Sequence, residues 1–473
     1  MQVYNSLTRK KTEFKTIEDK KVRMYSCGIT TYSDFHIGHA KQALQFDVIR
    51  RYLEYKGYNV TYVRNWTDVD DKIIAAANKN GMDPLDWAQI YIDRTSADMA
   101  ALGVRPADIE PKASETIPEI IEFVQTLIDN GHAYYNEETG DVLYNIAEFP
   151  EYGVLSGAVA QQSIGNWREG KNGEMTSGKA EDHQYDFALW KSAKPGEISW
   201  PSPWGQGRPG WHIECSAMSM KYLGETFDIH CGGKDLLFPH HENEIAQSEG
   251  ATGHPYVRYW MHNGFINVDN QKMSKSLGNF FTVRDIAKEY DLEAVRLFML
   301  SAHYRSPINF SREQIAAAHA SLTRLYTARD QMKFLLASAK DAPMTEEEQE
   351  LVQRLKGYEK RFDEAMDDDL NTADAIGAIF ELVKDANVSL TSASSKAAVE
   401  AALNSFKALT DVLGLVQKSE DTLPADIQAM VDERAAARKA KDWKRSDELR
   451  DAIKAAGYIL EDSREGQKVR KAL

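Results

Sequence analysis

The stretch KVRMYSCGITTYSDFHIGHAKQALQFDVIRRYLEYKGYNVTYVR, residues 21–64, decides the fold. Its first seven residues form a strand pattern that ends in a turn at Gly28. A long helical pattern follows from Ile37 to Lys56, and NVTYVR at 59–64 forms a second strand pattern. Strand, helix and strand joined by short turns predict a β-α-β unit of a parallel, doubly wound α/β sheet with a right-handed crossover.

The composition limits the class of protein. The 473 residues are 42% hydrophobic, 27% charged and 10% aromatic, which excludes a collagen, a mostly disordered chain and a disulfide-stapled miniprotein. No apolar run approaches the roughly 18 residues of a membrane-spanning helix, and the N-terminus lacks the apolar core of a secretory signal. Three cysteines fit a reducing compartment, so we expect a cytoplasmic protein with no membrane partner.

The patterns divide the chain into successive regions. The β-α-β pattern opens the chain, and a stretch rich in Gly, Ser, Lys and Trp then predicts an irregular insertion. Strand patterns resume with FDIH at 227–230, followed by a turn and a helix from about Phe238. Apolar residues at helical spacing later predict an all-α bundle and then a small tail. The expected regions are 1–150, the insertion 151–203, 204–265, a loop region 266–311, the bundle 312–420 and the tail 425–473.

Charge is unevenly distributed along the chain. The net charge is −15, yet the stretch from Arg434 to Leu473 holds twelve Lys and Arg against seven Asp and Glu. A basic tail can contact a polyanion such as a nucleic acid, or it can be a solvated helix face. Charge alone favours the second interpretation.

Two motifs can bind phosphate. His36-Ile-Gly-His39 lies where the first strand leads into the helix, and a helix N-terminus favours anions. Gly38 lets a ligand lie against the backbone. Lys272-Met-Ser-Lys275-Ser lies on a polar loop before a helix, and two mobile lysines can close on a polyphosphate. Histidines that only cap the helix and lysines that are only solvated remain the alternatives.

The cysteines and histidines form a candidate metal set. His240 and Glu244 are four residues apart, so they share one helix face and can bind one ion. Cys27 ends the first strand, and Cys215 follows GRPGWHIE. Thiolate, imidazole and carboxylate are the ligands that zinc prefers. Spacing alone leaves unconnected buried side chains as an alternative, and it leaves competing ligands open, which are His212, His230, Cys231 and His241.

In order and spacing these motifs resemble the class I aminoacyl-tRNA synthetases, and the surrounding residues resemble the cysteinyl-tRNA synthetases over essentially the whole chain. The segments that carry the resemblance are YSCGITTYSDFHIGHA (25–40), YVRNWTDVDDKI (62–73), DFALWK (186–191), GRPGWHIECSAM (207–218), FDIHCGGKDLLFPHHENEIAQS (227–248), KMSKSLGNFFT (272–282), HYRSPINFS (303–311) and the tail KDWKRSDELRDAIKAAGYILED (441–462).

The resemblance implies a Rossmann-like catalytic domain with an insertion, an all-α bundle and a small C-terminal domain. It implies a ligase that activates L-cysteine with ATP to cysteinyl-adenylate and transfers it to the 3′ end of tRNA(Cys). The implied cofactors are one Zn²⁺ per chain and Mg²⁺ with ATP. The bundle and the tail would hold the tRNA, and the family suggests a monomer.

The resemblance also assigns residues. The catalytic residues it implies are His36, His39, Lys272 and Lys275; those for ATP are Gly38, Gly232, Asp235 and Lys275; those for the substrate cysteine are Thr67 and Trp211; and those for zinc are Cys27, Cys215, His240 and Glu244.

Zinc explains how such an enzyme rejects serine. Cysteine and serine differ by one atom, and shape alone separates near-isosteres by only about 10–200-fold. A thiolate binds zinc strongly, whereas a hydroxyl competes weakly.

The chain departs from the family pattern at Ile29, where Pro is usual, at Cys231, where Gly is common, and in part of the insertion. We assign no role to Cys231.

Two other functions stay open on the sequence. One is a ligase that transfers activated cysteine to an amino sugar, which has little need of residues 311–473. The other is a catalytically inactive relative that only binds RNA, against which the intact histidine and lysine motifs argue.

Overall fold

The computed structural model describes residues 1–157, 186–273, 280–418, 425–463 and 466–471. These residues form two compact units, residues 1–415 and 416–473. The insertion residues 158–185 and the loop residues 274–279, which include Lys275, lie outside the described part. None of the helices in the described ranges is long and apolar enough to cross a membrane.

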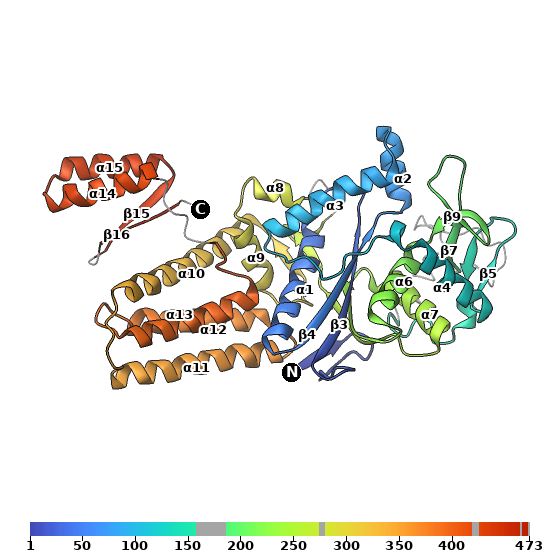
Figure 1. Ribbon diagram of the computed structural model, residues 1–473, viewed down its shortest axis with the longest axis horizontal. Helices are drawn as coiled ribbons and strands as arrows, with labels where there is room; N and C mark the ends of the chain where they lie inside the picture. Colours follow the sequence, from blue (N-terminus) through green and yellow to red (C-terminus); the bar gives the residue numbers. More distant parts are fainter. Residues whose placement is uncertain (158–185, 274–279, 419–424, 464–465, 472–473) are drawn as a thin grey trace. The chain divides into compact units, whose positions relative to one another are not determined.

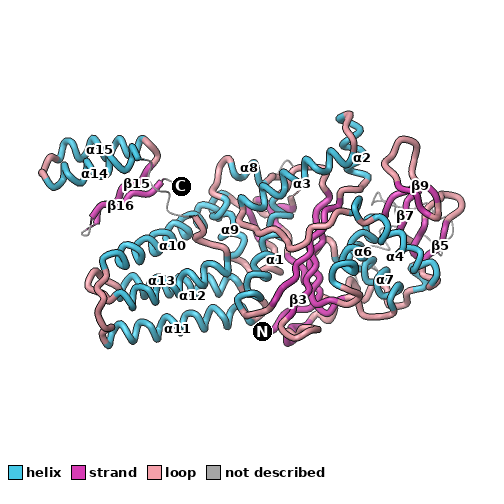
Figure 2. The backbone as a smooth tube through the Cα atoms, in the orientation of Figure 1, coloured by secondary structure: helices cyan, strands magenta, loops and turns pink. Residues whose placement is uncertain are grey.

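A parallel four-stranded sheet forms the centre of the first unit (Figures 1 and 2). The helix that joins its strands β3 and β4 packs against one face, and α6 and α7 lie on the other side. The predicted β-α-β unit and the doubly wound α/β class are therefore confirmed. The elements, in sheet order, are β11 (Val257–Asn263), β10 (Phe227–Gly233), β3 (Lys21–Thr30) and β4 (Asn59–Thr67), with α1 (Ile37–Tyr55), α6 (Trp211–Leu223) and α7 (Glu242–Thr252).

Gly28 lies inside β3 and does not form the turn that the sequence pattern predicts. The strand continues to Thr30, with a register shift between Ser26 and Ile29 where it pairs with β4. A Cβ atom at position 28 would lie 1.6 Å from the backbone oxygen of Asn65. Glycine is therefore required because the two backbones approach closely at this irregularity, next to Cys27.

A second sheet occupies part of the region that was expected to be irregular. Two strands, β7 and β8, fall within 151–203, and they pair with flanking strands in an antiparallel sheet. The expectation of an irregular stretch is therefore wrong for residues 187–192 and 200–202. The sheet order is β5 (Ala133–Tyr135), β6 (Val142–Tyr144), β7 (Phe187–Ser192), β9 (Gly205–Pro209) and β8 (Trp200–Ser202).

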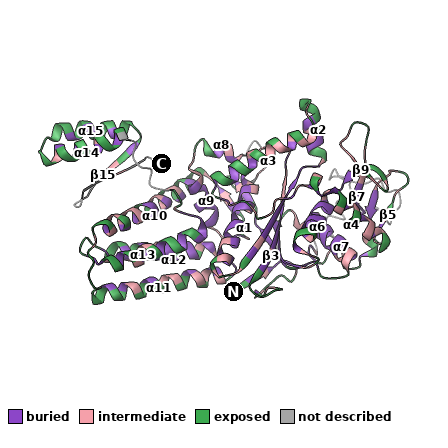
Figure 3. Ribbon diagram, in the orientation of Figure 1, coloured by how far each residue is buried: buried purple, intermediate pink, exposed green. Residues whose placement is uncertain are grey.

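Helices follow the central sheet as the apolar spacing predicted. Figure 3 shows exposed residues along the outer sides of α10 and α11 and buried residues between the helices. Ile315, Leu322, Leu325 and Met332 line the buried side of the first helix. The second begins with a capping box in which Thr345 and Glu348 bond each other's backbone N–H. The helices are α10 (Arg312–Ser338), α11 (Glu346–Asp367), α12 (Thr372–Ser389) and α13 (Lys396–Leu413).

Short elements connect these parts. A three-stranded sheet includes Lys272, the first residue of the lysine motif, and α8 and α9 connect its strands β13 and β14 in the chain. The remaining elements are β1 (Gln2–Asn5), β2 (Lys10–Glu13), α2 (Asp71–Asn80), α3 (Pro84–Ala101), η1 (Ala113–Glu115), α4 (Ile117–Asp129), η2 (Ile146–Glu148), η3 (Leu237–His241), β12 (Ile266–Val268), β13 (Gln271–Lys272), α8 (Val283–Ala287), α9 (Leu292–Leu300) and β14 (Ile308–Phe310).

The second unit has its own small core. Two helices pack on each other and on a β-hairpin through Ile427, Val431, Ile453 and Tyr458. Its elements are α14 (Ala425–Lys439), α15 (Trp443–Ala455), β15 (Tyr458–Ser463) and β16 (Gly466–Lys471).

Arg296 ties the catalytic part of the first unit to the bundle. Its guanidinium is buried and donates to the backbone oxygens of Leu413 at 2.8 Å and Leu102 at 3.2 Å, and to Asp47 Oδ2 at 3.2 Å. Leu413 ends α13, and Asp47 lies on α1 beneath the sheet. One side chain therefore satisfies acceptors from three separate segments.

We expect Arg296→Met to destabilise the first unit by about 3–5 kcal/mol, because it leaves two carbonyls and part of a buried carboxylate without a donor. The matched control is Arg312→Met, since that side chain is 82% exposed, and it should change stability by less than about 0.5 kcal/mol. Urea unfolding followed by tryptophan fluorescence measures both. Equal stability of the two variants would contradict the role of Arg296.

Candidate active site and metal centre

The candidate site lies at the carboxyl ends of β3, β4 and β10, where doubly wound sheets bind ligands. Cys27 comes from β3, and Cys215 comes from the first half of α6. His240 lies in the short helical turn η3 and Glu244 in the first turn of α7. Four elements from three separate stretches of the chain therefore contribute one side chain each, since η3 and α7 are consecutive.

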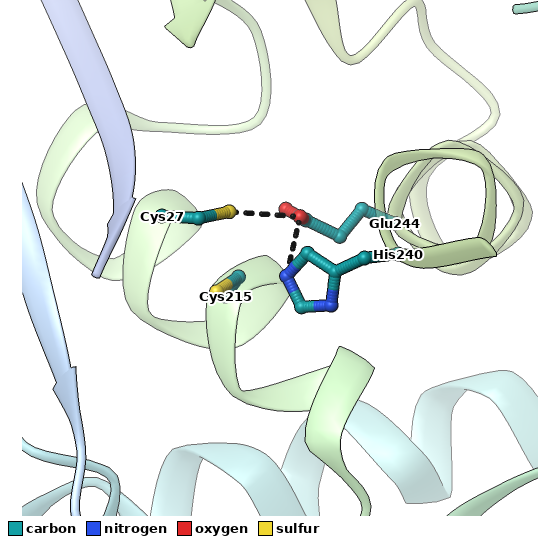
Figure 4. Close-up of side chains that lie close together, drawn as sticks. All are labelled: Cys27, Cys215, His240 and Glu244. Atoms are coloured by element: carbon teal, nitrogen blue, oxygen red, sulfur yellow. Dashed lines mark hydrogen bonds and ion pairs between the residues drawn. The ribbon is translucent and has the colours of Figure 1, made fainter. Parts of the chain in front are cut away.

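Figure 4 shows the side chains of Cys27, Cys215, His240 and Glu244 close together, with dashed lines that join Glu244 to Cys27 and to His240. Glu244 Oε1 lies 3.3 Å from Cys27 Sγ and 3.1 Å from His240 Nε2. One ligand atom from each of the four residues lies within 4.8 Å of the others, and all four residues are buried. Tetrahedral zinc holds its ligand atoms about 3.3–3.8 Å apart, so two thiols, an imidazole and a carboxylate in this arrangement fit the ion.

The structure brings together the four residues that the family resemblance assigns to zinc, and it also bears on the competing ligands. His230 and His241 lie against the same carboxylate, and with Cys27 and Glu244 they form a second candidate group. Cys231 belongs to neither group, since its thiol lies 3.2 Å from the backbone oxygen of Tyr25.

Outer hydrogen bonds orient the imidazoles, and the sequence analysis missed this function of the neighbouring histidines. His212 Nδ1 lies 2.9 Å from His240 Nδ1, which leaves His240 Nε2 directed at Glu244. His262 Nε2 lies 2.8 Å from His241 Nδ1. Such second contacts fix the tautomer of a metal-binding histidine. The strand pattern around His262 gave no signal for this, because the pairing depends on packing between β11 and the η3 turn.

The charges in the cluster follow from burial and proximity. Burial, with the hydrogen bond to Cys215, raises the pKa of the Cys27 thiol well above its usual range. Burial also opposes ionisation of Cys215, but the hydrogen bond from Cys27 and the charge of His240 outweigh it and lower that pKa to about 6. Burial disfavours charge on His240, yet Cys215 and Glu244 raise its pKa to about 10. Without a metal, Cys215 is thus a thiolate beside an imidazolium.

The first phosphate motif caps its own helix. His36 Nδ1 accepts hydrogen bonds from the backbone N–H of Gly38 at 3.2 Å and of His39 at 3.4 Å. The His36 and His39 rings stack with centroids 3.7 Å apart. His36 therefore caps the helix, and two backbone N–H groups of the first turn donate to its imidazole.

The two phosphate motifs lie side by side although 235 positions separate them. A Cβ atom at Gly38 would lie 3.4 Å from Met273 Cε, inside the lysine motif. Beyond the motif, the backbone of Ile37 donates to Phe281 O at 3.2 Å, and the Phe280 ring lies 5.0 Å from the ring of His36. Lys272 pairs through its backbone with Asn267. The residues on either side of 274–279 therefore contact the start of α1.

Of the remaining predicted residues, Trp211 and Gly232 lie against histidines of the cluster. The Trp211 ring lies 4.5 Å from that of His240, and Thr67 is buried at the end of β4, where Asn65 Nδ2 donates to its hydroxyl at 3.3 Å. A Cβ atom at Gly232 would lie 2.8 Å from the His241 ring, so Gly232 makes room for that histidine. Asp235 is exposed at the turn after β10. Packing therefore explains Gly232 without a nucleotide, and its assignment to ATP stays a prediction.

Comparison with known proteins identifies the class and then the family. Residues 13–320 match the model of the tRNA synthetases class I (C) catalytic domain, 361–417 that of the DALR domain, and 420–470 that of the cysteinyl-tRNA ligase anticodon binding domain. A leucyl-tRNA synthetase from Agrobacterium radiobacter shares the fold at a TM-score of 0.61 and 13% identity, covering 85% of each chain. Methionyl-tRNA synthetase of Mycobacterium tuberculosis shares it at 0.60 and 15%, covering 83% of this chain and 90% of that one.

Relatives over the full length are more specific. The cysteine–tRNA ligase of Lachnospira eligens is 51% identical over 98% of this chain and 99% of its own. That of Clostridioides difficile is 50% identical over 99% of each. The chain belongs to the cysteine–tRNA ligase family.

We expect binding of Zn²⁺ to the metal-free protein at pH 7 to release about two protons, one from Cys27 and one from His240, because ligands must be deprotonated. Cys215 and Glu244 are already charged at this pH, since their pKa values are lowered. Below pH 6 Cys215 is protonated in the metal-free protein and must also lose its proton when zinc binds. The number of protons released then rises toward about three, and the affinity for zinc falls. Calorimetry in buffers of different ionisation enthalpy counts the protons; release of fewer than one at pH 7 would contradict these charges.

Proposed function

We propose that the protein activates L-cysteine with ATP to cysteinyl-adenylate and transfers the cysteinyl group to the 3′ end of tRNA(Cys). The observation that carries this proposal is the ordered match of a class I catalytic domain, a DALR domain and a cysteinyl-tRNA ligase anticodon binding domain along one chain. An amino-sugar ligase would have little use for the last two. This match therefore favours tRNA as the acceptor.

Cys27, Cys215, His240 and Glu244 would hold one Zn²⁺. The bound ion supplies an acceptor for the thiolate of the substrate, which a serine hydroxyl cannot match. The buried donor set and its spacing support this assignment. Trp211 and Thr67 would close the pocket around the substrate, and the contact of Trp211 with His240 supports that position.

The start of α1 would receive the phosphates of ATP. His36, Gly38 and His39 lie at a helix N-terminus that favours anions. Lys272 and Lys275 would neutralise the departing pyrophosphate, with Mg²⁺ on the ATP oxygens, and the contacts of Met273 and Phe281 with α1 support a shared site. Gly232 and Asp235 would border the nucleotide at the end of β10. The reaction needs positioning and charge stabilisation more than covalent chemistry by the protein.

The helices and the tail would bind tRNA. We assign the bundle 312–420 to the body of the tRNA and the basic tail 425–473 to the anticodon, because the tail region matches the anticodon binding domain. The proposed catalytic domain comprises 1–150 and 204–265, interrupted by 151–203, with 266–311 contacting the stem. We further propose a cytoplasmic monomer, since the three cysteines are free thiols and the family resemblance suggests one chain.

We expect the zinc-loaded protein to exchange pyrophosphate into ATP only when cysteine is present, and to charge a tRNA(Cys) transcript. With serine, the exchange rate should be at least about 200-fold lower than with cysteine, which is a larger difference than pocket shape alone achieves. Exchange without charging would contradict the tRNA acceptor and favour another amine. Absence of exchange would contradict the enzyme and favour an inactive RNA-binding relative.

A chain that ends at Lys418 tests the role of the second unit. The first unit retains its own core, so exchange should stay within about twofold of the full-length rate. Charging should lose at least about tenfold in kcat/KM, equivalent to about 1.4 kcal/mol of lost tRNA contact. Undiminished charging would remove the tail from the tRNA interface.

A further inference from the structure

We propose that the buried cluster holds its single ion at either of two adjacent positions, the second formed by Cys27, His230, His241 and Glu244. The first position is the one assigned above, and the two share Cys27 and Glu244. This inference rests on the proposed zinc centre and adds a second place for a thiophilic divalent cation within it.

The atoms of the second position have the spacing of a metal site. Cys27 Sγ lies 3.3 Å from His241 Nε2 and 3.9 Å from His230 Nε2. Glu244 Oε2 lies 2.8 Å from His230 Nε2, and its Oε1 lies 4.0 Å from His241 Nε2. These separations bracket the roughly 3.3–3.8 Å between the ligand atoms of tetrahedral zinc. All four residues are buried, so water does not compete for them.

His241 is oriented for this position in the way His240 is oriented for the first. Its Nδ1 lies 2.8 Å from His262 Nε2, and His262 Nδ1 lies 2.8 Å from Ser6 Oγ. These hydrogen bonds occupy His241 Nδ1 and leave its Nε2 directed at Cys27.

The first position is the stronger one for zinc. It has two thiol ligands where the second has one, and soft thiolates favour zinc. His230 carries a further cost: with Nε2 on a metal, its proton moves to Nδ1, which is buried and has no hydrogen-bond partner among the described residues. The second position therefore fills when Cys215 is lost, or when the ion prefers imidazole to thiolate.

Shared ligands limit the cluster to one ion. Two divalent ions would divide Cys27 and Glu244 between them, and the three anionic side chains of both positions would not balance four positive charges. The second position also excludes His240, the ring on which Trp211 lies. An ion there is retained by the protein but is outside the proposed cysteine pocket.

Adjacent histidines provide the matched test. In a Cys215→Ala background, we add either His240→Ala, which touches only the first position, or His241→Ala, which touches only the second. We expect Cys215→Ala/His240→Ala to keep about one zinc per chain with one sulfur ligand, and Cys215→Ala/His241→Ala to bind zinc at least tenfold more weakly. Metal analysis and X-ray absorption at the zinc edge read out both, with circular dichroism as the control for folding.

The outcomes distinguish failure of the second metal position from failure of the proposed function. Loss of zinc from both variants, or from the His240 variant alone, would overturn the second position, and two ions in the unaltered protein would overturn the single-ion rule. An unaltered protein without zinc would instead overturn the proposed function. Should a double variant not fold, the unaltered chain loaded with Ni²⁺ decides: one sulfur and two imidazoles at the nickel edge support the second position, and two sulfurs refute it.

Discussion

The buried negative charge of Glu244 is the constraint on which the active-site end of the molecule depends. A carboxylate removed from water is costly unless it is paired and hydrogen-bonded. Here His230 and His240 contact it at 2.8 and 3.1 Å, and the Tyr256 hydroxyl and Cys27 thiol donate to it at 3.2 and 3.3 Å. These partners come from β3, β10, η3 and the segment before β11, so one charge holds together four chain segments. A bound cation would satisfy the same charge more completely.

Much of the fold could be predicted from local patterns, and the errors arise where pairing is distant. The strand and helix patterns of residues 21–64 are confirmed because each is set by its own periodicity. The strand β7 was missed because its partner β6 lies more than 40 residues earlier, and only that pairing makes Phe187–Ser192 a strand. Gly28 was misjudged as a turn because its requirement comes from the backbone of Asn65, which the local sequence does not reveal.

The candidate site could be predicted only with the help of the family resemblance. Spacing predicted that His240 and Glu244 lie on one helix face, and the structure places them in the consecutive elements η3 and α7 with their side chains 3.1 Å apart. Spacing could not choose between the neighbouring histidines. The geometry explains this: His230 and His241 lie on the other side of the same carboxylate and are themselves well placed as ligands. The resemblance selected one group of donors, and the structure contains two.

X-ray absorption at the zinc edge, recorded with and without L-cysteine, tests the central claim most directly. The account predicts two sulfur neighbours from Cys27 and Cys215 in the free protein and a third when cysteine is added, with no such change for L-serine. A spectrum that cysteine leaves unaltered would contradict a metal that selects the substrate through its thiol.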